Sequence, residues 1–334
     1  MSSQNRKWFK AAPALAMLIA VGWAISPDRR SSATLRLQWQ VMGTLWTAEI
    51  VHQGQPEQAN AALNAVMAEL RRIDELMSEW RPESPVSAIN DHAGRGLVEV
   101  PTELRELVER AVGYSERSGG VFDITWRGMG RIWRFDDEFR VPSPAEVSAA
   151  KSRVGYRGIR IEGNRVGLAR AGMSIGLGGI AKGYALDRCG AVLRAKGFDN
   201  WLLDGGGDVL VSGARNGAPW SLGIQHPRKE RGALLGRVSL SHGALITSGD
   251  YERFRIVDGV RYHHIIDPRS GWPATASRSV TVLADSAEAG VVLAKVIFIY
   301  GPERASKENV EALVVDKDGR CHARPPFQCA AVLP

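Results

Sequence analysis

The sequence predicts an α+β fold, in which helices and strands are grouped along the chain instead of alternating regularly. Between residues 57 and 196 the predicted elements are helices, whereas strand-like patterns dominate residues 201–284. The chain has 334 residues and a hydrophobic content of 44%, which is enough for a large core. No repeat, low-complexity segment or linker interrupts residues 34–330, so we expect one domain there.

The first two predicted elements are strands, and helices follow them. Apolar residues alternate over residues 35–41, and a second strand is predicted over residues 45–51. Apolar residues at helical spacing predict an amphipathic helix over residues 57–79. The next three helices are expected from Thr102 to a stop at Gly119 and Gly120, from the capping signal Ser143-Pro144-Ala145-Glu146, and from about Ile180 to Lys196.

Strands dominate the second half of the chain. The dipeptides Asp258-Gly259 and Asp318-Gly319 are typical of two-residue hairpin turns. A last long helix is predicted over residues 286–299, with a stop at Gly301. The predicted strands cover residues 201–204, 208–212, 219–225, 235–240, 253–257, 260–266 and 278–284.

The N-terminus has the layout of a secretory signal. Basic residues precede an apolar stretch over residues 11–25, and small residues occur at its end, at Ala24 and Ser26. We therefore expect residues 1–26 to be a cleaved signal peptide or an uncleaved membrane anchor. Either would place the protein in the periplasm or at the outer face of the inner membrane.

Charge and cysteine content exclude some classes of function. The formal net charge is +7, but the basic residues are scattered, which argues against a nucleic-acid-binding protein. The cysteines match no zinc-binding spacing. Cys321 and Cys329 can pair in an oxidising compartment or remain free thiols, and the sequence leaves both open. Cys189 lies in a predicted helix and is expected in the core.

The densest glycine cluster runs from Gly176 to Tyr184 and opens a predicted helix. Backbone amides in such a turn, together with the helix N-terminus, form an anion site suited to a pyrophosphate. The cluster also matches the dinucleotide pattern G-x-G-x-x-A, but no βαβ unit surrounds it. A nicotinamide oxidoreductase and a purely structural turn are the alternatives.

Further blocks accompany this cluster. Together they resemble the FAD:protein FMN transferase (ApbE-like) family over roughly residues 36–316, which implies an α+β domain of the T-fold-related type. The two most specific blocks are residues 179–184 and residues 264–271. The others are Met42-Gly43-Thr44, Met77-Ser78-Glu79-Trp80-Arg81, residues 118–125, residues 204–208 and residues 247–251.

The resemblance implies an enzyme that cleaves FAD, transfers FMN to a Thr or Ser hydroxyl of an exported target protein, and releases AMP. It makes His264 the candidate catalytic residue; the alternative is an ordinary strand histidine. Trp80 would stack on a ring of FAD, unless it is a core residue at the helix end. Thr247 and Ser248 would lie near the phosphates. The remaining FAD-binding residues that the resemblance implies are Met42, Val121, Phe122, Asp123, Lys182 and Ile266.

This sequence departs from the family at a metal site and at a cofactor site. The family carries an Asp and, four residues later, a Thr that bind Mg²⁺, and Val291 and Lys295 stand at those positions. An Asp of the family that binds the cofactor is Gly176 here. Of the metal ligands, only the backbone carbonyl of Gly179 remains. Two interpretations of the Mg²⁺ site follow: the Lys295 ammonium replaces the cation, or the site has decayed. A non-catalytic FAD-binding protein is the alternative function.

Overall fold

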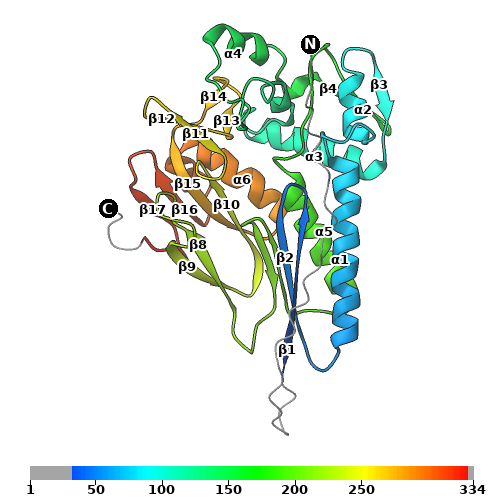
Figure 1. Ribbon diagram of the computed structural model, residues 1–334, viewed down its shortest axis with the longest axis vertical. Coiled ribbons are helices and arrows are strands. Elements are labelled where there is room, and N and C mark those ends of the chain that lie inside the picture. Colours follow the sequence, from blue (N-terminus) through cyan, green and yellow to red (C-terminus); the bar gives the residue numbers. More distant parts are fainter. Residues whose placement is uncertain (1–31, 330–334) are drawn as a thin grey trace, which may run out of the picture.

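The computed structural model describes residues 32–329, and an eight-stranded sheet forms its centre (Figure 1). Each neighbouring pair in this sheet is antiparallel. The α+β fold class is thus confirmed, while residues 1–26 lie outside the described part. The strand order is β1 (Ala33–Val41), β2 (Thr44–His52), β6 (Trp201–Gly205), β7 (Val209–Ser212), β10 (His242–Gly249), β15 (Ser277–Ala284), β16 (Ala312–Asp316) and β17 (Cys321–Ala323).

The two faces of the sheet are covered differently. Helices α1 (Pro56–Met77), α5 (Ala181–Ala195) and α6 (Ala287–Tyr300) pack on one face and bury the largest apolar cluster. The hairpin of β8 (Trp220–Gln225) and β9 (Leu234–Leu240) packs on the other face over a second apolar cluster. Residues alternate between the two faces along each strand, so both sets of side chains come from the same strands.

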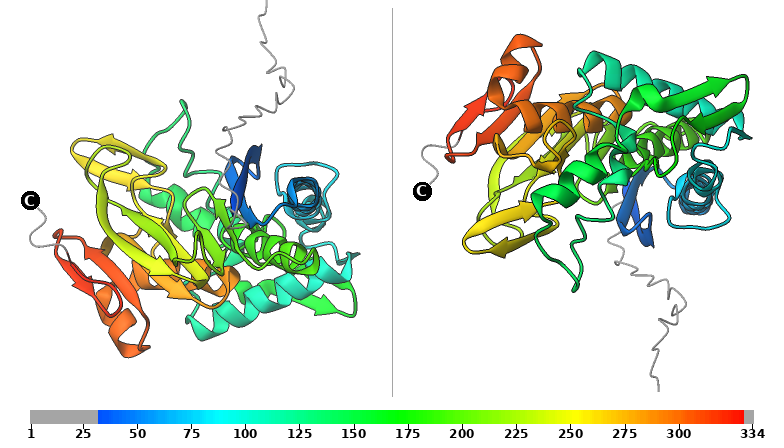
Figure 2. Two further views of the ribbon diagram at one scale, coloured as in Figure 1. Left: turned by 90° about the horizontal axis from the view of Figure 1, so that it is seen from below. Right: turned by 90° about the horizontal axis from the view of Figure 1, so that it is seen from above.

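Smaller elements complete the fold, and Figure 2 shows how they surround the sheet. A third apolar cluster, which includes Met129, Trp133 and Ile266, connects several of them. They are α2 (Pro85–Asp91), β3 (Leu97–Glu99), α3 (Thr102–Arg117), a 3₁₀ turn (Ile124–Gly128), α4 (Pro144–Lys151), a second 3₁₀ turn (Tyr156–Gly158), β4 (Ile159–Glu162), β5 (Arg165–Leu168), β11 (Phe254–Val257), β12 (Val260–His263), β13 (Ile266–Asp267), β14 (Trp272–Pro273) and α7 (Pro302–Lys307).

Local sequence signals account for several of these boundaries. The Ser143 hydroxyl accepts a hydrogen bond from the Glu146 amide, and the Glu146 carboxylate accepts one from the Ser143 amide, which confirms the capping box of α4. Asp258 and Gly259 have φ angles of +51° and +75°, so this hairpin turn is also confirmed. The turn at Asp318-Gly319 joins β16 to β17 as predicted.

Other predictions were wrong in position or incomplete. Helix α1 ends at Met77, two residues before the predicted end, because Ser78 is extended at φ −76° and ψ 120°. The strand predicted over residues 260–266 ends at His263. The central strand β10 was not predicted, since it is buried over most of its length and its sequence does not alternate. Also not predicted were α2, α7, β3, β4 and β5.

The cysteines have different roles in the structure. Cys321 and Cys329 form a disulfide, which settles the choice that the sequence left open. It ties the edge strand β17 to the segment that follows it. Cys189 is buried in α5, as predicted.

Helices α5 and α6 approach each other closely at Gly183. A Cβ at this position would lie 2.4 Å from the Ala287 carbonyl oxygen and 2.8 Å from Val291 Cγ2. We therefore expect Gly183→Ala to destabilise the protein by about 1–3 kcal/mol, as other overpacked sites do. Urea unfolding would measure this. The control is Gly236→Ala in β9, where a Cβ would meet nothing within 4 Å; equal stability of both variants would contradict the packing role.

Candidate functional site

Several predicted site residues meet at the glycine turn that precedes α5. From the position of a Cβ at Gly179, the Phe122 ring lies 3.5 Å away and Lys295 Cε lies 3.9 Å away. Glu79 approaches the same turn, with its Oε1 3.9 Å from such a position at Gly178. The turn therefore brings together residues from the segment after α1, the segment after α3, and α6.

Two lysines and an aspartate make the polar contacts at this turn. Lys182 Nζ lies 3.3 Å from Asp208 Oδ2, so Lys182 is not a freely solvated first-turn lysine. Asp208 also accepts a hydrogen bond from the Thr247 amide through Oδ1 at 3.3 Å. Lys295 Nζ donates to the Val291 carbonyl oxygen at 3.2 Å. Glu79 and Asp204 add carboxylates near the same turn, so it is the two ammonium groups, and not an excess of positive charge, that suit this turn to a pyrophosphate.

Lys295 carries a positive charge that neighbouring carboxylates compensate only weakly. Burial lowers the pKa of Lys295 to about 8, Asp208 raises it, and Lys182 lowers it further. An ammonium that is partly stripped of water interacts strongly with an anion that enters the same space. The site therefore gains most from a ligand that brings negative charge.

His264 stands on the segment between β12 and β13. Burial lowers the pKa of His264 to about 3, and His263, Arg253 and Lys295 lower it too. The imidazole is therefore neutral near pH 7. Its Nδ1 lies 3.3 Å from the Arg253 carbonyl oxygen, which we assign to an Nδ1–H donor. This tautomer leaves Nε2 free to accept a proton.

The neighbouring His263 has a different environment. It is buried, and its Nε2 lies 2.8 Å from the Ala274 carbonyl oxygen. Its Nδ1 accepts a hydrogen bond from the Ile265 amide at 3.3 Å. Both ring nitrogens of His263 are thus committed to the backbone. Of the two adjacent histidines, only His264 keeps a ring nitrogen for chemistry.

Trp80 is exposed, with 72% of its surface accessible. The Arg127 guanidinium lies 3.9 Å from the centre of the Trp80 ring. The alternative interpretation of Trp80 as a core residue is therefore wrong. Because α1 ends at Met77, Trp80 lies outside the helix and presents a flat apolar face.

The side chains of Glu79 and Arg127 lie next to Gly176, and the sequence did not predict that they meet there. A Cβ at Gly176 would lie 3.0 Å from Glu79 Oε1 and 3.1 Å from Arg127 Cδ. Burial raises the pKa of Glu79, and Arg127 lowers it. Glu79 therefore brings a carboxylate to the place where the resemblance expects an Asp. Arg127 was missed because a single arginine in an irregular segment forms no pattern.

Asp123 holds the segment after α3 in place. Its Oδ1 accepts hydrogen bonds from the amide and hydroxyl of Thr125, at 2.7 Å and 2.6 Å. Its Oδ2 accepts one from the Tyr156 amide at 2.8 Å. The carboxylate is buried and engaged, so it positions the neighbouring Val121 and Phe122, which are also buried.

Met42 and Ile266 lie on two separate hairpins. Met42 occupies the turn between β1 and β2 with a φ of +51°, followed by Gly43 at +70°. Ile266 pairs with Pro273 in the short ladder of β13 and β14 and is buried in the third apolar cluster. Each of the two residues is therefore positioned by the hairpin in which it lies, and each belongs to one of the motif blocks.

The residues present do not fit a Mg²⁺ site of the predicted kind. Within residues 32–329, no group of three or more His, Cys, Asp or Glu residues is arranged to hold a metal ion. Val291 is 2% exposed and has no side-chain oxygen. At the second ligand position, the side chain of Lys295 lies beside Gly179 and also has no oxygen to offer a metal. Mg²⁺ requires several oxygen ligands in an octahedral arrangement.

Comparison with known proteins gives a consistent picture. The model of the ApbE family matches residues 42–314. The FAD:protein FMN transferase of Treponema pallidum is 33% identical, over 85% of this chain and 84% of the relative. The FAD:protein FMN transferase of Vibrio cholerae is 28% identical, over 90% of this chain and 89% of the relative.

Solved structures agree with this assignment. The ApbE protein of Thermotoga maritima has a TM-score of 0.80 and 33% identity, over 88% of this chain and 97% of that one. The flavin transferase ApbE of Vibrio cholerae has a TM-score of 0.80 and 28% identity, over 89% of this chain and 99% of that one. The family model covers most of the chain, and both kinds of relative span nearly all of it. This chain belongs to the ApbE family.

Proposed function

We propose that this chain is an FAD:protein FMN transferase, which moves FMN from FAD to a Thr or Ser hydroxyl of an acceptor protein. The hydroxyl oxygen forms a bond to the FMN phosphorus, the bond from that phosphorus to the bridging oxygen breaks, and AMP leaves. The observation that carries the proposal is the pairing of two ammonium groups at the glycine turn, those of Lys182 and Lys295, with the neutral imidazole of His264. Curated relatives that span most of the chain carry this name.

Each residue contributes a different physical effect. Lys182 and Lys295 stabilise the negative charge that builds on the pyrophosphate as it is cleaved. Nε2 of His264 takes the proton of the attacking hydroxyl, because the negative charge of the substrate's pyrophosphate raises the low pKa of this imidazole. Asp123 orders the segment that carries Val121 and Phe122 beside the turn. Met42 and Ile266 would contact FAD from their hairpins, as the resemblance implies.

The metal requirement follows from the same residues. FAD is the substrate, and we propose that the Lys295 ammonium takes the place of Mg²⁺. Lys295 lies beside Gly179, whose carbonyl is the remaining candidate ligand, and residues 32–329 contain no cluster of three or more His, Cys, Asp or Glu suited to a metal. A lysine acts as a point charge on phosphate groups without the need for further ligands.

Export of both the enzyme and its acceptor is part of the proposal. The N-terminal signal pattern and the Cys321–Cys329 disulfide both support an oxidising compartment, in the periplasm or at the outer face of the inner membrane. Among residues 32–329, no helix is both long and apolar enough to cross a bilayer.

A direct assay tests the proposed function. The purified protein is incubated with FAD and an extract of its own cells, and covalent flavin is detected by fluorescence on a denaturing gel. Release of AMP is measured by chromatography. A fluorescent protein band together with AMP is the expected result. FAD binding without either product would show a non-catalytic FAD-binding protein, which no observation favours at present.

Trp80 provides a prediction for FAD binding. Trp80→Ala should weaken FAD binding by about 1–3 kcal/mol, the range for losing one stacked ring. Fluorescence titration with FAD would measure this. Because Trp80 is exposed, its removal should leave the urea midpoint unchanged. An FAD affinity equal to that of the wild type would show that Trp80 does not stack on the substrate.

A further inference from the structure

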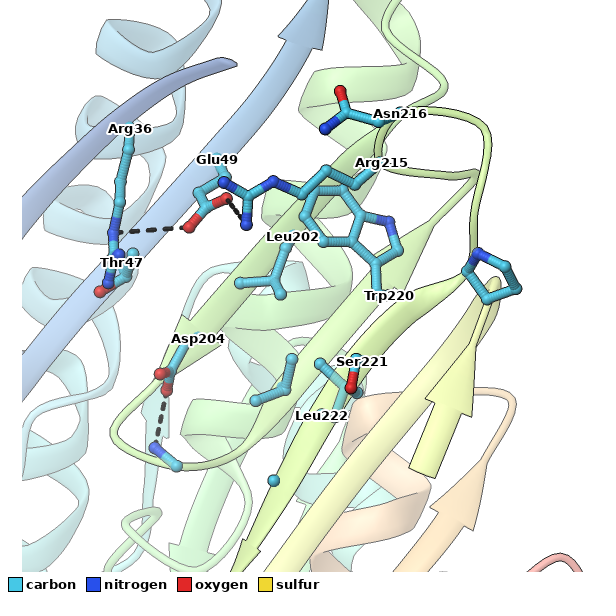
Figure 3. A pocket seen from close by; sticks show the side chains of 14 residues that line it. Arg36, Thr47, Glu49, Leu202, Asp204, Arg215, Asn216, Trp220, Ser221 and Leu222 are labelled. Atoms are coloured by element: carbon cyan, nitrogen blue, oxygen red, sulfur yellow. Dashed lines mark hydrogen bonds and ion pairs between the residues drawn. The ribbon is translucent and has the colours of Figure 1, made fainter. Parts of the chain in front are cut away.

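A cavity of about 510 Å³ lies away from the helices, on the face of the sheet that β8 covers (Figure 3). Strands β1, β2, β6 and β8 contribute its walls, and the loop before β8 adds Arg215 and Asn216. Asp204 and Gly207 line another part of it. The candidate FAD site does not use this space, apart from the turn that both share.

The most unusual group in the cavity is the carboxylate of Glu49. Its side chain is 8% exposed, and its Oε2 has no hydrogen-bond partner. Figure 3 shows this carboxylate between two arginines, with Oε1 at 3.5 Å from Arg36 Nε and Oε2 at 3.7 Å from Arg215 Nη1. These ion pairs are too long to be hydrogen bonds. A buried acceptor without a donor is costly, so the cavity favours a ligand that supplies an N–H or O–H group.

The two arginines can each bind a further anionic group. The side chains of Arg36 and Arg215 are 57% and 52% exposed, and at this end of the cavity Glu49 balances only one of the two charges. The second carboxylate of the lining, Asp204, is engaged by the Gly207 amide in the other part of the cavity. Guanidinium groups bind carboxylates in a fixed, often bidentate geometry. This end of the cavity therefore favours an acidic group on the ligand. Leu202, Leu222 and Trp220 provide apolar surface next to it.

Strand β8 offers backbone groups along one side of the cavity. It pairs with β9 alone, in a sheet of two strands. Within residues 32–329, no other strand pairs with its second edge, and residues 219–223 line the cavity. An open edge of this kind can accept an extended peptide as a further strand. The N–H groups of such a peptide are also the donors that Glu49 lacks.

We propose that this cavity binds an extended, acidic segment of the acceptor protein. The peptide nature of the ligand stands on the cavity alone, and only its assignment to the acceptor rests on the proposed function. Asp204 and Gly207 belong to the same turn as Asp208, the partner of Lys182. A segment bound in the cavity therefore reaches the turn that also carries Asp208, and we place its hydroxyl-bearing residue at this turn.

Two synthetic probes test the peptide site without any acceptor. Both are blocked ten-residue peptides rich in Thr and Val, one with two Asp residues and one with two Lys residues in their place. We expect the acidic peptide to bind at least about tenfold more tightly in fluorescence polarisation, with or without FAD. Failure of the acidic peptide to bind, or equal binding of both, would overturn the inference whatever the FMN transfer assay shows.

Matched variants locate the binding. Ser221→Trp should fill the cavity and abolish binding of the acidic peptide, whereas Ser239→Trp should not, because Ser239 is its partner on β9 and lies outside the cavity. Arg215→Gln should weaken the acidic peptide about tenfold while Arg36 still faces Glu49. Circular dichroism checks that each variant folds. Binding that survives in both Ser221→Trp and Arg215→Gln would also overturn the inference.

The same variants connect the cavity to catalysis. With a protein that the wild type flavinylates, Ser221→Trp should raise KM for that protein at least about tenfold and leave FAD affinity unchanged. Unchanged KM would refute the role in acceptor binding. If the wild type flavinylates nothing, the proposed function fails, and the peptide measurements still decide whether the cavity binds peptides.

Discussion

His264→Ala is expected to lower the rate of FMN transfer by about 100-fold or more, while FAD affinity stays within about threefold of the wild type. The reason is that Nδ1 of His264 faces the Arg253 carbonyl oxygen, so Nε2 is the nitrogen that can take a proton. The imidazole is neutral near pH 7 and makes no ion pair that FAD binding would need. Covalent flavin formed per minute and FAD titration are the two measurements.

A matched control separates chemistry from structure at this position. His263→Ala removes the buried imidazole that bonds the Ala274 carbonyl oxygen, so it should lower stability more than His264→Ala does. Burial holds the pKa of His264 at about 3, below its ordinary value, so unfolding takes up a proton as pH falls below about 6.5. The wild type should lose stability there, and His264→Ala should lose less. Normal transfer by His264→Ala would exclude it as the base.

Lys295→Met is expected to lower FMN transfer by about 100-fold or more, in the range for loss of one preorganised charge at a reacting centre. The wild type should bind FAD and transfer FMN equally well with EDTA and with added Mg²⁺. The physical reason is that Lys295 supplies a fixed positive charge next to Gly179, where the described residues provide no carboxylate set for a metal. Methionine keeps the length and packing of the side chain without its charge.

Two further variants make this result specific. Lys295→Arg keeps the charge and should retain part of the activity. Lys307→Met removes an exposed lysine from α7 and should change nothing. A strong stimulation of the wild type by Mg²⁺, or full activity of Lys295→Met, would contradict the replacement of the metal and would favour decay of the site.

Local signals predicted much of the fold, because they act over a few residues. The capping box at Ser143 and the Asp258-Gly259 turn need no distant partner, and both were predicted from the sequence. Strand β10 pairs with a strand on each side, and its apolar and polar residues do not alternate, so no local pattern predicted it. The spacing of apolar residues also did not locate the end of α1 at Met77. Because the helix ends there, Trp80 lies outside it and is exposed.

The candidate site shows the same division. The motif blocks located the glycine turn and His264, because their residues are consecutive. The contact of Glu79 and Arg127 with Gly176 joins three separate segments, and no spacing rule connects them. The cavity on the other face was also out of reach, since Arg36, Glu49 and Arg215 come together only through strand pairing and a loop.

The order of strands in the sheet has a consequence for how the chain reaches its native state. Leu202 of β6 pairs with Glu49 of β2, so two neighbours in the sheet are separated by about 150 residues of chain. Pairing of distant segments slows folding, because a long loop must close before the contacts form. The β1–β2 hairpin therefore waits with one edge of β2 unpaired until more than half of the chain is present. During synthesis this unpaired edge is open to wrong pairing and aggregation.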